Sequence, residues 1–278
     1  MTELAPSHPA TLSAGPRRPR RKSRQSLVAY ALVAPFFVVF LAMFLVPLSY
    51  SGYLSMFSSR LIGGQVFVGL SNYARAFTDP LFLGGLARMA LFLVVQVPIM
   101  LALSLFLALA LDSARARGGK AARLAIFIPH AVPGVVATLM WGYLYGNDFG
   151  PIAQFFRAIG LGAPNLLGSD NALGSIINIV SWEYVGYNMI IMYAALQSIP
   201  SELFEAAEID GAGRIRTAIS IKIPAIRPAI FLTVIFSIIG SFQLFNEPNL
   251  LARIAPNAIS DSFTPNLYAY NLAFVSEM

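Results

Sequence analysis

Five long apolar runs constrain this chain more than any other feature of its sequence. Each residue of an α-helix rises about 1.5 Å, so about 20 apolar residues are needed to cross the hydrocarbon core of a bilayer. Runs of this length are Leu27–Tyr50, Leu86–Leu111, Leu124–Tyr145, Ala172–Leu196 and Ala229–Phe245. Of the 278 residues 57% are hydrophobic, and the mean hydropathy is +0.68. A single soluble core cannot hide such runs, so we predict an all-α membrane protein with five spans.

The distribution of lysine and arginine predicts the orientation of these spans. Six of the 19 bases precede the first run, four lie in the segment 115–123, and four lie in the segment 214–227. Cytoplasmic segments retain an excess of these residues, so we predict a multi-pass protein with its amino terminus in the cytoplasm. Because the bases lie between apolar runs, the net charge of +6 does not indicate a nucleic-acid partner.

The two ends of the chain differ in character. Residues 1–26 are rich in Pro, Ser and Arg, which predicts a disordered basic cytoplasmic tail. The run after it is longer than the apolar region of a signal peptide and lacks a clear cleavage site, which favours a retained span. Residues 27–278 are predicted to form one transmembrane domain. No run of spanning length follows Phe245, so the sequence fits either a five-span protein with an external carboxyl terminus or the loss of a sixth span.

A charged segment, ELFEAAEIDGAGRIRTAISIKIPAIRPA, separates the last two apolar runs. Ser201 is predicted to cap a first helix, and Gly211 to end that helix in a left-handed conformation. A second helix is predicted from Arg214 to Ile221, with Pro224 as its interruption. The result is a helical hairpin in a cytoplasmic loop at about 197–228. Its small residues suit docking into the groove of a partner, but periodicity alone also allows a solvated loop that packs on the membrane surface.

This segment carries a resemblance. Glu205-Ala206-Ala207, Gly211 and Ile221-x-Ile223-Pro224 resemble, at their spacing, the EAA signature of inner-membrane permeases in binding-protein-dependent ABC importers. The family pattern usually has Leu where this chain has Ile223. Three further segments resemble carbohydrate permeases of the maltose and glycerol-phosphate type: VGLSNYARAF at 68–77, IPHAVPGVVATLMW at 128–141 and WEYVGYNMIIMYAALQSIP at 182–200.

The resemblance implies a fold, a role and a set of partners. The fold would be that of a MetI-like type I importer permease in the bacterial cytoplasmic membrane, in contact with lipid. The partners would be a second permease subunit, a cytoplasmic ATPase dimer that uses ATP and Mg²⁺, and an extracytoplasmic sugar-binding protein. The residues that would couple to the ATPase are Glu205, Ala206, Ala207, Asp210, Gly211, Ile221 and Pro224. Permeases of this type usually end with one more span, so the resemblance favours the loss of a sixth span.

An enzymatic role of the chain itself has little support in the sequence. The segment ARGGKAAR at 116–123 lacks the spacing and the final Ser or Thr of a phosphate-binding loop. The two histidines, His8 and His130, are too far apart for a helical zinc motif, and there are no cysteines. We therefore predict a non-enzymatic subunit that binds no metal or cofactor itself. His130, between Pro129 and Pro133, is expected to be structural, at a bend.

Polar residues at membrane depth are the candidates for a substrate pathway, because burying them is costly without a partner or a wet cavity. Aromatic rings and amides near Glu183 suit the apolar face and hydroxyl edge of a sugar. Phe236, Gly240, Gln243 and Glu247 are predicted to share one stripe of the last span. The predicted pathway residues are Trp182, Glu183, Tyr187, Asn188, Gln243, Asn246 and Glu247. Alternatively, these polar groups join helices to one another or to a second permease.

The sequence therefore allows three functions. The leading prediction is the transmembrane subunit of an ATP-driven importer of a sugar or oligosaccharide. An ion-coupled secondary transporter is the first alternative, although such proteins usually have more spans and more intramembrane carboxylates. A membrane scaffold that transports nothing is the second.

Overall fold

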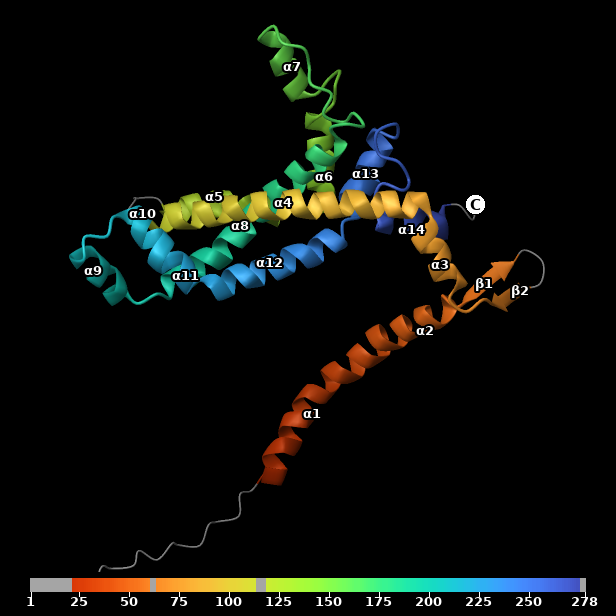
Figure 1. Ribbon diagram of the computed structural model, residues 1–278, viewed down its shortest axis with the longest axis horizontal. Coiled ribbons are helices and arrows are strands. Elements are labelled where there is room, and N and C mark those ends of the chain that lie inside the picture. The colour runs from red at the N-terminus through yellow and green to blue at the C-terminus, as the bar shows by residue number, and fades with distance from the viewer. Residues whose placement is uncertain (1–21, 61–63, 114–118, 276–278) are drawn as a thin grey trace, which may run out of the picture. The chain divides into compact units, whose positions relative to one another are not determined.

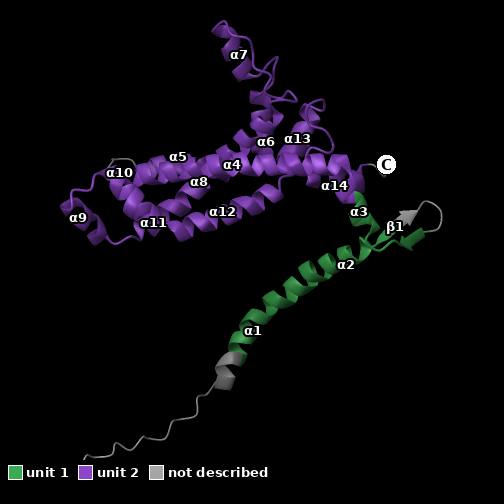
Figure 2. Ribbon diagram, in the orientation of Figure 1, with its two compact units in different colours: residues 1–75 green, residues 76–278 purple. Residues whose placement is uncertain are grey.

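The computed structural model describes residues 22–60, 64–113 and 119–275 (Figure 1). These residues form two compact units, one within residues 1–75 and the other within 76–278 (Figure 2). Most of the predicted disordered tail, residues 1–21, lies outside the described residues. The first helix begins at Lys22, before the predicted start of the first span at Leu27.

The first unit contains one long apolar helix. It consists of α1 (Lys22–Phe40), a π-helical turn η1 (Leu41–Leu45) and α2 (Val46–Leu54). Its stretch Leu27–Leu54 has a mean hydropathy of 2.6 and is long enough to span a membrane. A two-stranded antiparallel hairpin that we did not predict follows, with β1 (Phe57–Arg60) paired to β2 (Gly64–Phe67). The strands are too short for a clear alternating pattern in the sequence.

The start of α3 (Ser71–Thr78) is held against this hairpin by a side-chain amide. Nδ2 of Asn72 donates to the carbonyl oxygens of Ser55 and Phe57, each at 2.9 Å. The sequence placed no element between the first two apolar runs, so the hairpin and α3 are additions to the predicted fold.

The second unit is built around α4 (Pro80–Ser113) and α8 (Ala172–Gln197), which run side by side (Figure 1). Their shared core contains Val97, Met100, Leu101, Ala108, Met189, Met192 and Leu196. α4 has a mean hydropathy of 2.5 and extends beyond the predicted run at both ends. The long apolar helices confirm the predicted fold class.

The third predicted span is broken. It consists of α5 (Gly119–Ala131) and α6 (Gly134–Leu144), which meet at 93°. A bend near Pro133 was expected, because proline has no N–H and disfavours helix at the residue before it. The size of the bend means that Leu124–Tyr145 is not one straight rod.

The coupling segment begins as a hairpin, as predicted. α9 (Ser201–Ile209) ends before Gly211, whose φ of +74° is the left-handed conformation expected there. The predicted cap is wrong: Pro200 occupies the N-cap position, no side chain caps the helix, and Ser201 is already helical.

The interruption at Pro224 is also wrong. α10 (Arg214–Thr217) continues through the π-helical turn η2 (Ala218–Lys222) into α11 (Ile223–Ala225). Pro224 lies in the first turn of α11, after the wider π-turn, and its missing N–H is tolerated there. The chain bends by 67° only afterwards, at Ile226, where α12 (Arg227–Phe242) follows.

The remaining helices are short: α7 (Pro151–Ala158), α13 (Asn246–Ile254) and α14 (Pro265–Phe274). α13 packs on α6 at Gly142, where an added Cβ would lie 2.7 Å from Cδ1 of Ile254. Among the described residues, length and composition identify two helices as spans, or up to four if each bent pair is one span. α8 matches the fourth predicted span in position but is not one of these, because polar residues interrupt its apolar surface.

Candidate functional site

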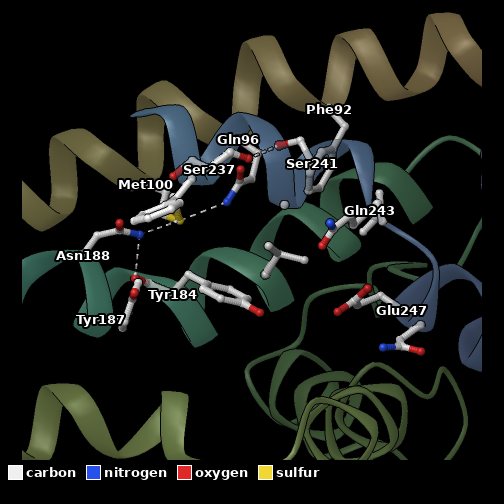
Figure 3. Close-up of a pocket in the computed structure, with 15 residues that line it drawn as sticks. Phe92, Gln96, Met100, Tyr184, Tyr187, Asn188, Ser237, Ser241, Gln243 and Glu247 are labelled. Carbon is white, nitrogen blue, oxygen red and sulfur yellow. Dashed lines mark hydrogen bonds between the residues drawn. The ribbon is translucent and has the colours of Figure 1, made fainter. Parts of the chain in front are cut away.

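A cavity of about 240 Å³ lies between α4, α8, α12 and the start of α13 (Figure 3). Its wall from α4 and α8 consists of Phe92, Gln96, Met100, Val180, Tyr184, Tyr187 and Asn188. Its wall from α12 and the segment after it consists of Phe236, Ser237, Gly240, Ser241, Gln243, Leu244, Asn246 and Glu247. The cavity is thus formed by three parts of the chain that are far apart in sequence.

Two buried amides form one side of the cavity. Nε2 of Gln96 donates to Sδ of Met100 at 3.1 Å. Nδ2 of Asn188 donates to the carbonyl oxygen of Tyr184 at 3.0 Å and lies 3.7 Å from the same sulfur (Figure 3). Gln96 is 2% exposed and Asn188 is 3% exposed. Their contacts hold both amides in place at the cavity wall.

The opposite wall is lined by hydroxyl groups of α12. Oγ of Ser237 donates to the carbonyl of Thr233 at 2.7 Å, and Oγ of Ser241 donates to the carbonyl of Ser237 at 2.8 Å. Each hydroxyl proton is therefore used inside the helix, and each oxygen keeps lone pairs that can accept a hydrogen bond.

The four residues predicted to share one stripe of the last span reach the cavity from α12, from the residue after it and from α13. Phe236 and Gly240 lie on α12, but the helix ends at Phe242. Gln243 follows that end, and Glu247 lies in the first turn of α13. All four line the cavity, although they do not share one helix. The expectation of a single continuous stripe is therefore wrong, while the convergence of its residues is found.

The predicted pathway residues divide into two groups. Tyr187, Asn188, Gln243, Asn246 and Glu247 line the cavity, whereas Trp182 and Glu183 do not. The rotation of α8 explains the division, because Val180, Tyr184, Tyr187 and Asn188 follow the spacing of one helical face. Trp182 lies on the opposite side of α8, whereas Glu183, three residues after Val180 and four before Tyr187, lies at the edge of that face.

Trp182 and Glu183 instead contact α6. Trp182 packs edge-on against Trp141, with 5.8 Å between the ring centroids. Glu183 is buried, and its Oε1 lies 3.4 Å from the position that a Cβ on Gly134 would take. Its carboxyl group therefore lies beside Gly134, the first residue of α6. Next to this break, His130 stacks on Tyr187 at 4.6 Å.

Sequence reasoning missed the contribution of α4. Phe92, Gln96 and Met100 recur every four residues, which places them on one helical face. A signal was present, since Gln96 is the one amide in the second apolar run. Tyr184 was also missed, although it lies one turn before Asn188.

The predicted coupling residues form the second feature of the chain. Ala206, Ala207, Asp210 and Ile221 line a hollow between the two arms of the hairpin. Ala207 is buried, and the carbonyl oxygen of Ala207 accepts the N–H of Ala212 at 2.8 Å across the Gly211 turn. Glu205 and Ala206 are exposed. Pro224 lies outside this hollow, in α11.

The hairpin also exposes large apolar side chains that sequence reasoning did not select. Ile209 is 86% exposed and Ile215 is 77% exposed, and both lie beside the Gly211 turn. Isolated branched apolar residues in a charged segment were the available signal.

Comparison with known proteins shows which family contains this chain. Residues 9–275 match the family described as the binding-protein-dependent transport system inner membrane component. The chain is 33% identical to the lactose transport system permease protein LacF of Rhizobium radiobacter, over 91% of this chain and 87% of LacF. It is 30% identical to the probable ABC transporter permease protein YurN of Bacillus subtilis, over 92% of this chain and 88% of YurN.

A solved structure shows the same fold. The chain matches a bacterial ABC transporter involved in the import of the acidic polysaccharide alginate with a TM-score of 0.79 and 20% identity, over 91% of this chain and 86% of that chain. The family match covers nearly the whole sequence and includes both the cavity and the hairpin. The chain therefore belongs to the inner membrane components, or permeases, of binding-protein-dependent transport systems.

Proposed function

We propose that this permease forms the translocation pathway of an ATP-driven sugar importer, and that the cavity between α4, α8 and α12 binds the sugar in transit. The observation that carries the proposal is the lining of the cavity. Two tyrosines offer faces for the apolar side of a sugar ring, while amides, serine oxygens and Glu247 offer partners for its hydroxyls. LacF, named for lactose transport, supports a sugar as the cargo.

The charge of the cavity favours a neutral sugar over an acidic one. Glu247 lies in the wall, and the described residues that line it include no lysine or arginine. A lining without a cation leaves the charge of an acidic ligand unpaired in the cavity, which disfavours such a ligand relative to a neutral sugar. A relative named for sn-glycerol-3-phosphate transport, UgpA of Yersinia enterocolitica, is 31% identical, so the family also serves anions. A volume of about 240 Å³ suits one sugar ring at a time.

The energy for transport is proposed to come from a separate ATPase. The hairpin of α9 and α10 would seat in a cytoplasmic ATPase dimer that binds ATP and Mg²⁺, with exposed Glu205, Ala206 and Ile209 at the contact. A second permease subunit and an extracytoplasmic sugar-binding protein would complete the importer. The amino terminus would lie in the cytoplasm.

The transport proposal is tested by uptake in cells that express the chain with its neighbouring transport genes. The substrate panel contains the neutral sugars lactose, maltose and arabinotriose, together with digalacturonate as the acidic probe. We expect saturable uptake of a neutral sugar that stops when ATP is depleted and falls at least tenfold in Gln96→Leu. Uptake of digalacturonate alone would contradict the neutral-sugar proposal. Uptake that survives ATP depletion and collapses with an ionophore would favour an ion-coupled transporter.

The docking proposal is tested by co-purification through a tag on this chain. Glu205→Lys should lose the ATPase while still inserting in the membrane, because the change reverses an exposed charge at the proposed contact. Asp170→Lys is the matched control, since Asp170 is also exposed but lies before α8, away from the hairpin. Equal recovery of the ATPase from all three proteins would count against this docking surface.

A further inference from the structure

One carboxylate ties the coupling hairpin to the ends of two long helices. Asp112 lies in the last turn of α4. Its Oδ1 accepts a hydrogen bond from Nε2 of Gln197, the last residue of α8, at 2.7 Å. Its Oδ2 forms an ion pair with Nζ of Lys222, which lies 110 residues away in sequence. Both oxygens of Asp112 are thus used, each by a different helix.

Lys222 connects this carboxylate to the hairpin. It is the last residue of the π-helical turn η2, which continues directly from the second arm, α10. Its ammonium also lies 5.1 Å from the ring centroid of Phe204 on the first arm, α9. The cation therefore contacts α4 by charge and α9 by a cation–π interaction.

The pair is shielded from water. The side chain of Asp112 is 11% exposed and that of Lys222 is 14% exposed. A charge-assisted hydrogen bond at this burial is stronger and less screened by salt than a surface pair, and removing one partner leaves the other charge uncompensated. None of these residues is among the predicted coupling or pathway residues.

The position of the ion pair in the fold allows it to transmit a force from the hairpin to the long helices. The wide π-turn η2 and the 67° bend at Ile226 are points where the helical ladder is weakest, so a force on the hairpin would be absorbed there. The contact from Lys222 to Asp112 carries the force to α4 before the bend at Ile226, and the contact of Lys222 with Phe204 carries force from α9 without passing through η2. α4 carries Gln96 and α8 carries Asn188, the two amides of the cavity wall.

We propose that Asp112 is a positioning residue, which holds Lys222 so that movement of the coupling hairpin reaches the helices that wall the cavity. This inference rests on the proposed function, since it assumes that an ATPase moves the hairpin. The new element is the ion pair between Asp112 and Lys222, through which that movement is transmitted. Without this ion pair, the ATPase would still bind the hairpin, but ATP hydrolysis would no longer change the shape of the cavity.

The test uses the importer complex purified through this chain and reconstituted in proteoliposomes with its sugar-binding protein. Asp112→Asn and Lys222→Gln should still co-purify the ATPase. We expect stimulation of ATP hydrolysis by the loaded binding protein to fall to near the basal rate, and sugar uptake to fall at least tenfold. The exchange Asp112→Lys with Lys222→Asp should recover part of both, because it restores the attraction. Asp170→Asn, remote from the pair, should behave as wild type.

A milder variant covers the case in which Asp112→Asn fails to fold. Phe204→Leu removes the ring and keeps the ion pair, so we expect a partial loss of stimulation with the ATPase still bound. Wild-type stimulation and uptake in the single variants, with only a lower unfolding temperature, would overturn the proposal and leave the pair a structural anchor. An exchange no better than the single variants would overturn it as well. Failure of the wild-type chain to recover any ATPase would instead refute the docking itself.

Discussion

At the scale of single residues, close backbone approach decides which positions accept no side chain. A Cβ added to Gly186 of α8 would lie 2.0 Å from the carbonyl oxygen of Ile126 on α5. A Cβ added to Gly174 of the same helix meets nothing within 4 Å. The two glycines look alike in the sequence, but only Gly186 lies where two helices touch.

We predict opposite effects of alanine at these two positions. Gly186→Ala should destabilise the protein by about 1–3 kcal/mol, because the rigid backbone of α5 must move to admit the methyl group. Gly174→Ala should be neutral or stabilising by up to about 1 kcal/mol, since alanine favours helix over glycine. Thermal unfolding of the purified proteins in detergent measures both. Equal stability of the two variants would contradict the close packing of α5 on α8.

At the scale of elements, the short carboxyl-terminal helices are pinned to the start of α4. Nη1 of Arg88 donates to the carbonyl oxygen of Ser262 at 3.2 Å, and its guanidinium lies 5.4 Å from the ring centroid of Phe263. Just before α4, the hydroxyl of Tyr268 on α14 donates to Oδ2 of Asp79 at 2.6 Å. These contacts fix the segment after α12 and therefore support the cavity wall that contains Glu247.

The bond between Asp79 and Tyr268 should make this attachment sensitive to acid. The hydrogen bond from Tyr268 holds the pKa of Asp79 below its ordinary value of 3.8. A carboxylate with a lowered pKa in the folded state stabilises the fold above that ordinary value, and its contribution is lost as the pH falls through the folded pKa.

We therefore expect the wild type to unfold at a higher temperature than Asp79→Asn at neutral pH. The difference between the two unfolding temperatures should narrow as the pH falls below about 4, because Asp79 becomes protonated first in the unfolded chain and then in the folded protein. Tyr268→Phe should show the same narrowing, because it removes the other partner of the bond. A difference in unfolding temperature that stays constant with pH would show that the charge of Asp79 does not contribute to holding α14 against the start of α4.

At the scale of the whole molecule, orientation in the membrane decides which surface meets which partner. The excess of bases around the hairpin predicts that it faces the cytoplasm. The exposed segment before α8 would then face outward. The chain has no cysteines, so single introduced cysteines report on sidedness without background.

We predict that Asp170→Cys reacts with a membrane-impermeant maleimide in intact cells. Glu208→Cys, on the exposed surface of α9, should react only after the cells are permeabilised. Each position is exposed, so a difference in labelling reports the side of the membrane rather than burial. Labelling of Glu208→Cys in intact cells would reverse the proposed orientation and remove the hairpin from any cytoplasmic ATPase.

The sequence alone determined the features that depend on neighbours along the chain. Apolar runs predicted the long helices, Gly211 predicted the left-handed turn, and the prolines near His130 predicted a bend, since each needs only a few adjacent residues. The predicted cap at Ser201 is wrong because Pro200 takes the N-cap position. The predicted interruption at Pro224 is wrong because the π-helical turn η2 before it allows the helix to continue.

Only the tertiary structure decided which side chains meet. Gln96, Asn188 and Glu247 line one cavity because of the rotation of α4 and α8 about their axes and the end of α12 at Phe242. The same rotation directs Glu183 to α6. Asp112 finds Lys222 across 110 residues for the same kind of reason. Helix rotation is set by the sum of many small packing contacts between distant segments, and no local pattern in the sequence contains that sum.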